Sequence, residues 1–588
     1  MSSSSVQNFD DQESKTDNEI IEPSEKSHIK LFEKLYNILF KKYPILIILI
    51  IGIILRIIAF TRMQILKDGA VYSDIALGIL KHGTFISAEN NVPTWGESLV
   101  YPPYLAFFYK FLGFSVLSTQ LASLIAGIMA ILVVYLITAN IFDKRKGLIT
   151  AAIIAFTPWM IIATAANLTG NFVVIFLSLT LWAIIKSSEN TKYLAVAGVF
   201  ATLTFLTKTN IGLKFIVVGL VFFVIWQVYY HKKKILKDPY MIFFIAIILM
   251  SAFIRQYLVE LRPDPLSEDQ YVTYLFTSQG LVQLVIQLPL HLLLPATYFL
   301  FFIPETYRGI SEWRNRNNNL LIFVLLGGTG ILLIHAVART LMRGATPSFG
   351  LMMSALPDAS ERYFTAFIVP TVWLFLGYLK PYNKNQLSKK CNRTGIFRRF
   401  TEFGRFLIKR KKICFLFALL IGGLILILVD LWWGVVLCIG SFSIFFLRNV
   451  QWRVALIVIA FLIASFGSVI DSTQSMSYYI MDDMHNYIRE GDTIAIDNVS
   501  NFLPMAANLY FSDIEDVDFV EYDPQLPQSK YIITQENKTY ENYTLFKIYN
   551  DTFPPNLRAQ IYTELRRTTI DKDFVWEDDP PINVWLRN

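Results

Sequence analysis

Long apolar runs, separated by short polar loops, repeat along most of the chain. A helix that crosses a bilayer needs roughly 20 apolar residues, and these runs approach or exceed that length. About thirteen predicted spans follow from the pattern. They lie near residues 44–60, 117–141, 147–166, 170–186, 192–207, 211–229, 240–258, 281–303, 320–338, 363–379, 413–430, 431–447 and 454–470. The pattern therefore predicts an all-α, multi-span membrane domain over residues 44–470.

The two ends of the chain follow other patterns. Residues 1–28 are rich in Ser, Glu and Asp without a hydrophobic period, which is typical of a disordered tail. Residues 29–43 place apolar side chains at helical spacing between lysines, which predicts a helix lying on the membrane surface. Residues 471–588 alternate short apolar segments with turns and acids, which predicts a small α/β domain. Its predicted strands lie at 492–497, 517–522, 530–534 and 544–549.

Basic residues concentrate in alternate loops and so predict the orientation in the membrane. These loops are 143–146, 231–234, 314–319, 380–412 and 448–453. The predicted spans put all of them on one side, which we expect to be cytoplasmic because short cytoplasmic loops carry an excess of Lys and Arg. The N-terminus is then cytoplasmic, and both the loop 61–116 and the domain 471–588 lie outside.

Composition agrees with a multi-pass protein of the cell membrane. Of the 588 residues, 54% are hydrophobic and 17% are charged, too few polar residues for a soluble protein of this size. The net charge of +7 comes from loops between apolar runs, so membrane lipids rather than nucleic acids are the expected partners. The three cysteines are too few and too scattered for a disulfide framework.

The first outer loop carries the densest chemistry. Lys67, Asp68, Tyr72 and Asp74 lie within eight positions, just before apolar residues at helical spacing that end at Gly83. One interpretation is a catalytic segment held at the membrane surface; the other is a solvated loop with two helix-capping aspartates. Further along, the sequence Tyr-Pro-Pro-Tyr at 101–104 predicts the start of a second surface helix.

Four short motifs recur in an order that resembles a known family. They are Asp68 to Tyr72, Pro102-Pro103-Tyr104, Thr207-Lys208-Thr209-Asn210 and Glu361-Arg362-Tyr363. With this order, residues 44–230 and a weaker echo near 360–380 resemble the polyprenyl-phosphate-sugar-dependent glycosyltransferases of the GT-C fold. That group includes the protein mannosyltransferases and the lipid A aminoarabinose transferases.

The resemblance implies a membrane glycosyltransferase with a GT-C-like membrane domain. Its donor would be a sugar on a polyprenyl or dolichyl-type phosphate, and its acceptor a protein, lipid or polysaccharide on the outer face. Asp68 would act as the catalytic base, and Lys208 and Arg362 would bind the donor phosphate. The expected substrate-binding residues are Tyr72, Asp74, Tyr101, Tyr104, Asn171 and Tyr363.

Two departures from the family pattern leave the cofactor open. The family has acidic residues at two positions that are Gly69 and Gly170 here. No metal ligand is therefore assigned, although a divalent metal remains an alternative. The missing acids also keep a rival class, a lipid-linked-sugar transporter or a non-enzymatic scaffold on the same fold. Polar features gather in outer loops rather than through the depth of the spans, which favours the enzyme. Arg56, inside the first span, is costly there unless it is paired or faces a cavity.

Overall fold

The computed structural model describes ten stretches of the chain and a few isolated residues and short helical pieces between them. The stretches are 44–61, 67–86, 98–208, 232–260, 450–471, 486–497, 518–521, 529–534, 542–549 and 582–587. The predicted tail 1–28, the surface helix 29–43 and the spans 281–303, 320–338 and 413–430 lie outside these residues. Most of the spans 211–229, 363–379 and 431–447 do so as well.

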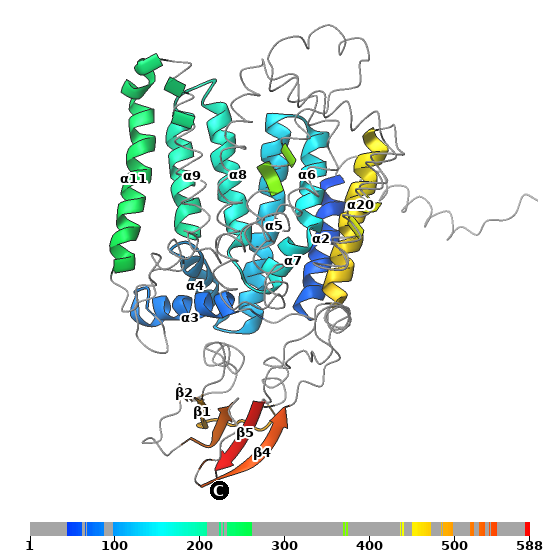
Figure 1. Cartoon of the computed structure of the whole chain (residues 1–588), viewed down its shortest axis with the longest axis vertical. Coiled ribbons are helices and arrows are strands. Elements are labelled where there is room, and N and C mark those ends of the chain that lie inside the picture. Colours follow the sequence, from blue (N-terminus) through cyan, green and yellow to red (C-terminus); the bar gives the residue numbers. More distant parts are fainter. Residues whose placement is uncertain are drawn as a thin grey trace, which may run out of the picture. The chain divides into compact units, whose positions relative to one another are not determined.

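Apolar helices lie side by side and form the main helical layer (Figure 1). They are α2 (Pro44–Phe60), α5 (Val116–Ile141), α6 (Lys144–Phe156), α8 (Gly170–Lys186), α9 (Tyr193–Thr207), α11 (Pro239–Glu260) and α20 (Val450–Asp471). A short 3-10 helix, η2 (Lys232–Lys237), precedes α11. Apart from α6, these bounds match the predicted spans to within a few residues, and α2 and α8 have the predicted bounds at both ends. The helical class predicted for this part of the chain is confirmed.

By length and apolar composition, α5 is the one described helix that could cross a membrane unaided, and the pair α6 and α7 (Pro158–Ala165) could cross as one bent span. The described parts of α2, α8, α9, α11 and α20 are apolar but shorter. The total of about thirteen spans therefore stays a prediction.

The predicted span at 147–166 is not one continuous helix, because the structure breaks it into α6 and α7 with a bend of 56°. Thr157 adopts an extended conformation, and Pro158 begins α7 without a backbone N–H to continue the first helix. Neighbouring helices satisfy carbonyls freed at this break. Arg56 of α2 donates to the Ala155 oxygen over 3.2 Å, and Ser465 of α20 donates to the Phe156 oxygen. Inside a membrane domain such partners are what makes a broken helix tolerable.

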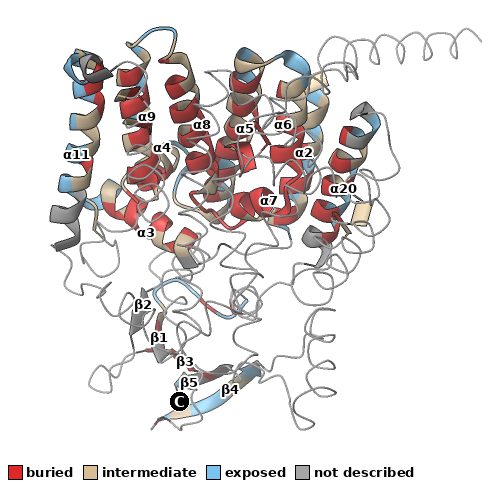
Figure 2. Cartoon of the chain, turned by 45° about the horizontal axis from the view of Figure 1, so that its top comes forward, coloured by how far each residue is buried: buried red, intermediate tan, exposed pale blue. Residues whose placement is uncertain are grey.

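Small residues let the helices approach closely. In α5 the buried face includes Ala122, Ala126, Gly127 and Ala130, and buried positions cover the inner faces of the layer (Figure 2). A Cβ added at Gly147 of α6 would lie 2.9 Å from the Tyr135 oxygen of α5. Close backbone approach of this kind is a common basis of helix packing in membranes.

Two short helices run across one end of this layer (Figure 1). They are α3 (Lys67–His82), which ends at Gly83 with φ of 70°, and α4 (Tyr101–Leu112), which has prolines in its first turn. Both surface helices predicted for the first outer loop are confirmed as helices. The Ser115 side chain then accepts from the Ser118 N–H and caps α5, so the chain turns from α4 into the layer.

The C-terminal residues form a five-stranded mixed sheet in the order β2-β1-β3-β5-β4. The strands are β1 (Thr493–Asp497), β2 (Asp518–Glu521), β3 (Tyr531–Thr534), β4 (Tyr543–Tyr549) and β5 (Ile582–Arg587). The first three pair in parallel, and β5 pairs antiparallel with β3 and β4. The four predicted strands are present. Sequence reasoning missed β5, although Ile582, Val584 and Leu586 alternate after two prolines.

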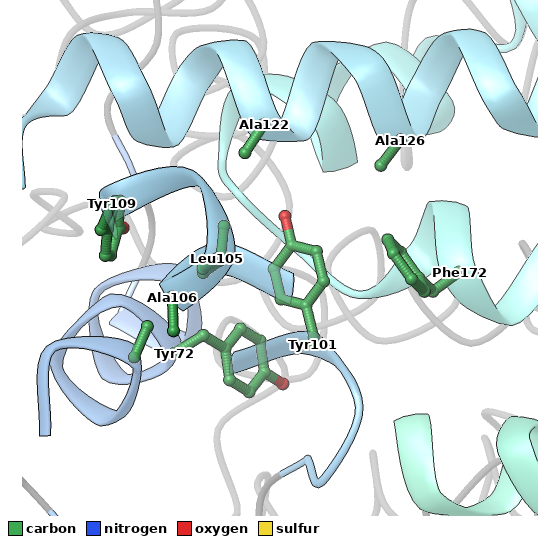
Figure 3. Close-up of a cluster of buried hydrophobic side chains, with 9 residues drawn as sticks. Tyr72, Tyr101, Leu105, Ala106, Tyr109, Ala122, Ala126 and Phe172 are labelled. Atoms are coloured by element: carbon green, nitrogen blue, oxygen red, sulfur yellow. The ribbon is translucent and has the colours of Figure 1, made fainter. Parts of the chain in front are cut away.

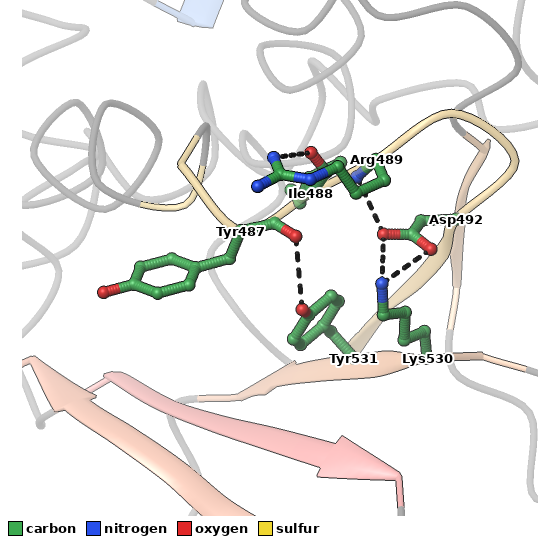
Figure 4. Close-up of polar contacts among 6 residues, drawn as sticks. All are labelled: Tyr487, Ile488, Arg489, Asp492, Lys530 and Tyr531. Atoms are coloured by element: carbon green, nitrogen blue, oxygen red, sulfur yellow. Dashed lines mark hydrogen bonds and ion pairs between the residues drawn. The ribbon is translucent and has the colours of Figure 1, made fainter.

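Polar contacts connect the turn before β1 to the start of β3 (Figure 4). Asp492 forms an ion pair with Lys530, 2.7 Å between Oδ2 and Nζ, and also accepts from the Arg489 N–H. The Tyr531 hydroxyl donates to the Tyr487 oxygen at the edge of the same group. These bonds order the turn before β1 against the start of β3.

Candidate functional site

The Asp68 segment lies in a helix rather than in a loop. Asp68 occupies the first turn of α3 and is half-buried, whereas Asp74, on another face of the same helix, is only 6% exposed. A carboxylate in the first turn is favourable because the helix dipole is positive there. Asp68 and Asp74 therefore have different surroundings, although they lie only six positions apart in the same helix.

Gly69 explains how α3 is seated. A Cβ at this position would lie 2.3 Å from the Ala166 oxygen and 2.9 Å from Ile65 Cγ2. Real Cβ atoms do not approach a backbone oxygen so closely, so only glycine fits here. The first turn of α3 thus packs directly against the backbone of the turn between α7 and α8.

Asn167, in that turn, joins α3 to α4. Its side chain is fully buried and its φ is 57°, a left-handed conformation that asparagine tolerates better than most residues. Nδ2 donates to the Gly69 oxygen over 2.9 Å and to the Ser73 hydroxyl over 3.1 Å. Oδ1 accepts from the Tyr101 hydroxyl over 2.6 Å. Sequence reasoning missed Asn167; an Asn in a short turn between two apolar helices was the signal that could have found it.

Aromatic side chains pack around this junction (Figure 3). Tyr101 of α4 meets Tyr72 of α3 edge to face, with centroids 5.6 Å apart, and meets Phe172 of α8 in the same way at 5.4 Å. Tyr104 lies 4.8 Å from the Phe172 ring and donates to the Ala122 oxygen over 2.8 Å. Edge-to-face pairs of this kind add to the stability gained by burial. They tie α3, α4, α5 and α8 into one cluster.

The tyrosines of α4 are held in the neutral form. Burial raises the pKa of Tyr101 and of Tyr104 well above the ordinary value for a phenol. Burial likewise raises the pKa of Tyr109 to about 12, and its hydroxyl pairs with Thr119 Oγ1 at 2.7 Å. In each case the cause is removal of the phenolate from water.

A second buried polar group lies on the other side of the same turn. Thr164 of α7 accepts from Arg56 Nε over 3.2 Å and from Asn171 Nδ2 over 3.0 Å, and it donates to the Met160 oxygen. The absence of a side chain at Gly127 makes space for the Arg56 guanidinium, because a Cβ at position 127 would lie 2.9 Å from Arg56 Nε. Within the described residues, Arg56 Nη2 and Asn171 Oδ1 have no hydrogen-bond partner. The Thr164 hydroxyl already donates its proton to the Met160 oxygen, so it must accept from the amide nitrogen of Asn171. The amide oxygen of Asn171 is then available to a donor.

Lys208 ends α9 beside the start of α4. Its extended backbone closes the helix with a bond from its N–H to the Thr204 oxygen, and its side chain is half-buried. Two residues earlier, the Leu206 oxygen accepts from the Leu99 N–H over 2.9 Å. That bond brings the end of α9 to the residues that precede Tyr101.

Seven of the predicted site residues therefore belong to one end of the helical layer. They are Asp68, Tyr72, Asp74, Tyr101, Tyr104, Asn171 and Lys208. Tyr72 and Tyr101 are fully buried, whereas Asp68 and Lys208 retain partial exposure. Arg362 and Tyr363 lie outside the described residues.

A metal held by a pair of acids at positions 68 and 69 does not fit this arrangement, because no side chain fits at Gly69. In the parts of the chain that the structure describes, no group of three His, Cys, Asp or Glu side chains could hold a metal ion.

Comparisons with known proteins agree with this geometry. Residues 97–255 match the family described as dolichyl-phosphate-mannose-protein mannosyltransferase. The structure of ArnT from Cupriavidus metallidurans bound to undecaprenyl phosphate aligns with a TM-score of 0.52 at 11% identity, over 92% of this chain and 97% of that one. The chain has the GT-C fold.

A more distant GT-C relative is the oligosaccharyltransferase of Archaeoglobus fulgidus, with a TM-score of 0.40 at 13% identity over 84% of this chain and 70% of that one. No curated protein matches the sequence. The family match and the GT-C fold together indicate a GT-C-type glycosyltransferase, as the motif order predicted. The family match and the fold, whose members are integral membrane proteins, support a location in the membrane.

Proposed function

We propose that this GT-C protein transfers a sugar from a polyprenyl or dolichyl-type phosphate to a protein, lipid or polysaccharide acceptor. The observation that supports this most directly is the position of the Asp68 side chain. It is a half-buried carboxylate in the first turn of α3, held at the end of the helical layer where Lys208 also lies. ArnT, which has the same fold, was crystallised with undecaprenyl phosphate.

Asp68 is proposed as the base. An acceptor hydroxyl is a weak nucleophile, and a carboxylate within hydrogen-bond reach can take its proton as it attacks. A bond forms between the acceptor oxygen and the anomeric carbon, the bond from that carbon to the phosphate oxygen breaks, and the proton passes to the carboxylate of Asp68. The polyprenyl phosphate leaves with the electron pair.

Lys208 is proposed to stabilise the charge that grows on the leaving phosphate. Fixed cations in a poorly hydrated site are effective at this because they need no reorganisation during the reaction. Arg362 is proposed for the same task on the basis of its sequence motif, since a guanidinium can bind two phosphate oxygens at once. Tyr72, Asp74, Tyr101, Tyr104, Asn171 and Tyr363 are proposed to shape the substrate-binding region. Among them, Asn171 is completely buried, and its proposed part is to support that region from behind its surface.

The proposed reaction side is the outer face of the cell membrane, with the N-terminus cytoplasmic and the C-terminal domain outside. The charge distribution of the loops supports this orientation. The rival function is a transporter or scaffold, supported by the missing acids at Gly69 and Gly170. Gly69 weakens that support, because the packing against Ala166 requires glycine there.

The test uses purified protein in lipid and a panel of polyprenyl-phosphate monosaccharides, and it follows release of polyprenyl phosphate. Release by the wild type that is lost in Asp68→Asn supports a transferase with Asp68 as its base. Asp143→Asn is the matched control, because Asp143 caps α6 and asparagine caps equally well. If Asp68→Asn works at the wild-type rate, Asp68 is not the base. If a folded wild type binds a donor and releases nothing from any of them, the transporter or scaffold becomes the better account.

A further inference from the structure

In the turn between α7 and α8, the Asn167 side chain forms hydrogen bonds with both short helices, α3 and α4. Asn167 is completely buried and makes its three hydrogen bonds to Gly69 and Ser73 of α3 and to Tyr101 of α4. Of these, Gly69 directly follows Asp68. None of the motifs that carry the family resemblance includes Asn167.

The chemistry of the partners fixes how the Asn167 amide is turned. The Gly69 oxygen can only accept, so the group facing it must be Nδ2. The Ser73 hydroxyl donates its own proton to the same Gly69 oxygen over 2.9 Å, and therefore accepts the second Nδ2 hydrogen. Oδ1 is left for the Tyr101 hydroxyl. Both amide hydrogens and the amide oxygen are thus used.

We propose that Asn167 is a positioning residue that sets the place of the Asp68 carboxylate through the first turn of α3. This inference rests on the proposed function. Ser73 Oγ lies 2.9 Å from the Gly69 oxygen, so both Nδ2 bonds meet α3 at the same point and hold its first turn against the turn that carries Asn167. The glycine packing keeps the first turn of α3 against the Ala166 backbone, and the amide bonds hold the same turn to residue 167.

The residue type follows from two requirements. The backbone needs a φ of 57°, which favours Gly, Asn and Asp over other residues. The side chain needs two donors and one acceptor in one plane, which asparagine has and aspartate lacks. Asn167→Asp therefore keeps the size, the backbone conformation and the bond from Tyr101, but sets a carboxylate oxygen against the Gly69 oxygen. Asn167→Gly keeps the backbone conformation and removes all three bonds.

The experiment compares wild type, Asn167→Asp, Asn167→Gly and Ser73→Ala in lipid. Asn542→Gly is the matched control, because Asn542 is the other described non-glycine residue with positive φ and lies exposed at the start of β4. Two quantities are measured: kcat and KM for the lipid-linked donor per folded molecule, and hydrogen exchange of backbone amides in peptides that cover residues 65–75.

We expect Asn167→Asp to lower kcat about tenfold or more while KM for the donor changes less than threefold, as a shift of about 1 Å in a reacting group can cost 100-fold. Amides of the first turn of α3 should exchange faster in both Asn167 variants, and Ser73→Ala should show a smaller change of the same kind. A purely packing role would lower the folded fraction and leave kcat per folded molecule unchanged; that result overturns the proposal.

The results distinguish a failure of the proposed transferase function from a failure of the positioning role of Asn167. A wild type that turns over no donor removes the proposed function, and the exchange measurement still decides whether Asn167 holds the turn. An active wild type whose Asn167→Asp variant keeps kcat within twofold and exchanges at the wild-type rate removes the positioning role alone. Should Asn167→Gly fail to fold, Asn167→Asp and Ser73→Ala carry the test by themselves.

Discussion

Gly69 and Ala166 approach so closely that a Cβ on residue 69 would lie 2.3 Å from the Ala166 carbonyl oxygen. The contact joins the helix that carries Asp68 to the turn that carries Asn167. It also means that this position is glycine because of backbone packing. Glycine stands where the family motif has its second acid, and the packing against Ala166 requires glycine there.

The first prediction concerns that contact. Gly69→Ala should destabilise the protein by about 3 kcal/mol or more, because backbone rather than a flexible side chain blocks the added atom. Gly69→Glu, which restores the family's acid, should be at least as damaging and should not raise activity. Thermal unfolding in detergent measures the loss of stability, and donor turnover measures activity. A Gly69→Ala variant that unfolds at the wild-type temperature would contradict the packing described here.

The second prediction concerns the buried guanidinium of Arg56. It donates to Thr164 and to the Ala155 oxygen at the break between α6 and α7. Arg56→Met removes both donors and should cost about 1–3 kcal/mol, the usual penalty for buried polar groups left unpaired. Arg145→Met is the matched control, since Arg145 is exposed in the first turn of α6.

Thermal unfolding of the two variants in the same detergent distinguishes their roles. Arg56→Met should unfold at a clearly lower temperature, and Arg145→Met close to the wild type. Arg56→Lys should not restore the wild-type value, because an ammonium group cannot reproduce the planar fork that reaches two acceptors. Equal unfolding temperatures for Arg56→Met and Arg145→Met would mean that Arg56 does not support the helix break.

Local sequence pattern was sufficient for the helices and insufficient for the contacts that assemble the site. The bounds of α2 and α8 could be predicted because Pro44 and Gly170 start apolar runs that charged or polar residues end. Pro158 was visible in the sequence, but whether a proline kinks a helix or divides it depends on outside donors such as Arg56 and Ser465. Asn167 binds Gly69 from 98 positions away, a pairing that no periodicity encodes.

The third prediction concerns alkaline pH. Burial raises the pKa of Tyr109 to about 12, against about 10 in an unfolded chain. The folded state therefore favours the neutral phenol. Its contribution to stability is complete below about pH 10 and is lost as the pH rises to about 12, a change of about 3 kcal/mol from the shift in pKa. Tyr101 and Tyr104 shift in the same direction and add to this loss.

Unfolding temperature as a function of pH, read together with tyrosinate absorbance, checks this. Tyr109→Phe should lower stability at neutral pH, because the hydrogen bond between Tyr109 and Thr119 is lost, and should flatten the decline at alkaline pH. An alkaline slope in Tyr109→Phe as steep as that of the wild type would show that Tyr109 does not titrate with unfolding.

The fourth prediction concerns Lys208, which lies at the end of α9 where backbone bonds hold the chain. The Lys208 N–H binds the Thr204 oxygen, and the neighbouring Leu206 oxygen binds Leu99. A substitution of the side chain keeps these backbone bonds, and its effect on the donor phosphate is read from donor binding. Lys208→Ala should raise KM for the lipid-linked donor about tenfold, the size expected for one lost charge-assisted hydrogen bond of about 1.5 kcal/mol.

Lys208→Arg should retain most of the donor affinity, and its partial rescue separates charge from packing of the aliphatic stem. Lys192→Ala is the control, since Lys192 is an exposed lysine at the other end of the same helix. Raising the salt concentration should weaken donor binding in the wild type more than in Lys208→Ala, because the variant has lost the charge that salt would screen. If Lys208→Ala binds donor as the wild type does at every salt concentration, the lysine only marks the membrane interface and the phosphate is held elsewhere.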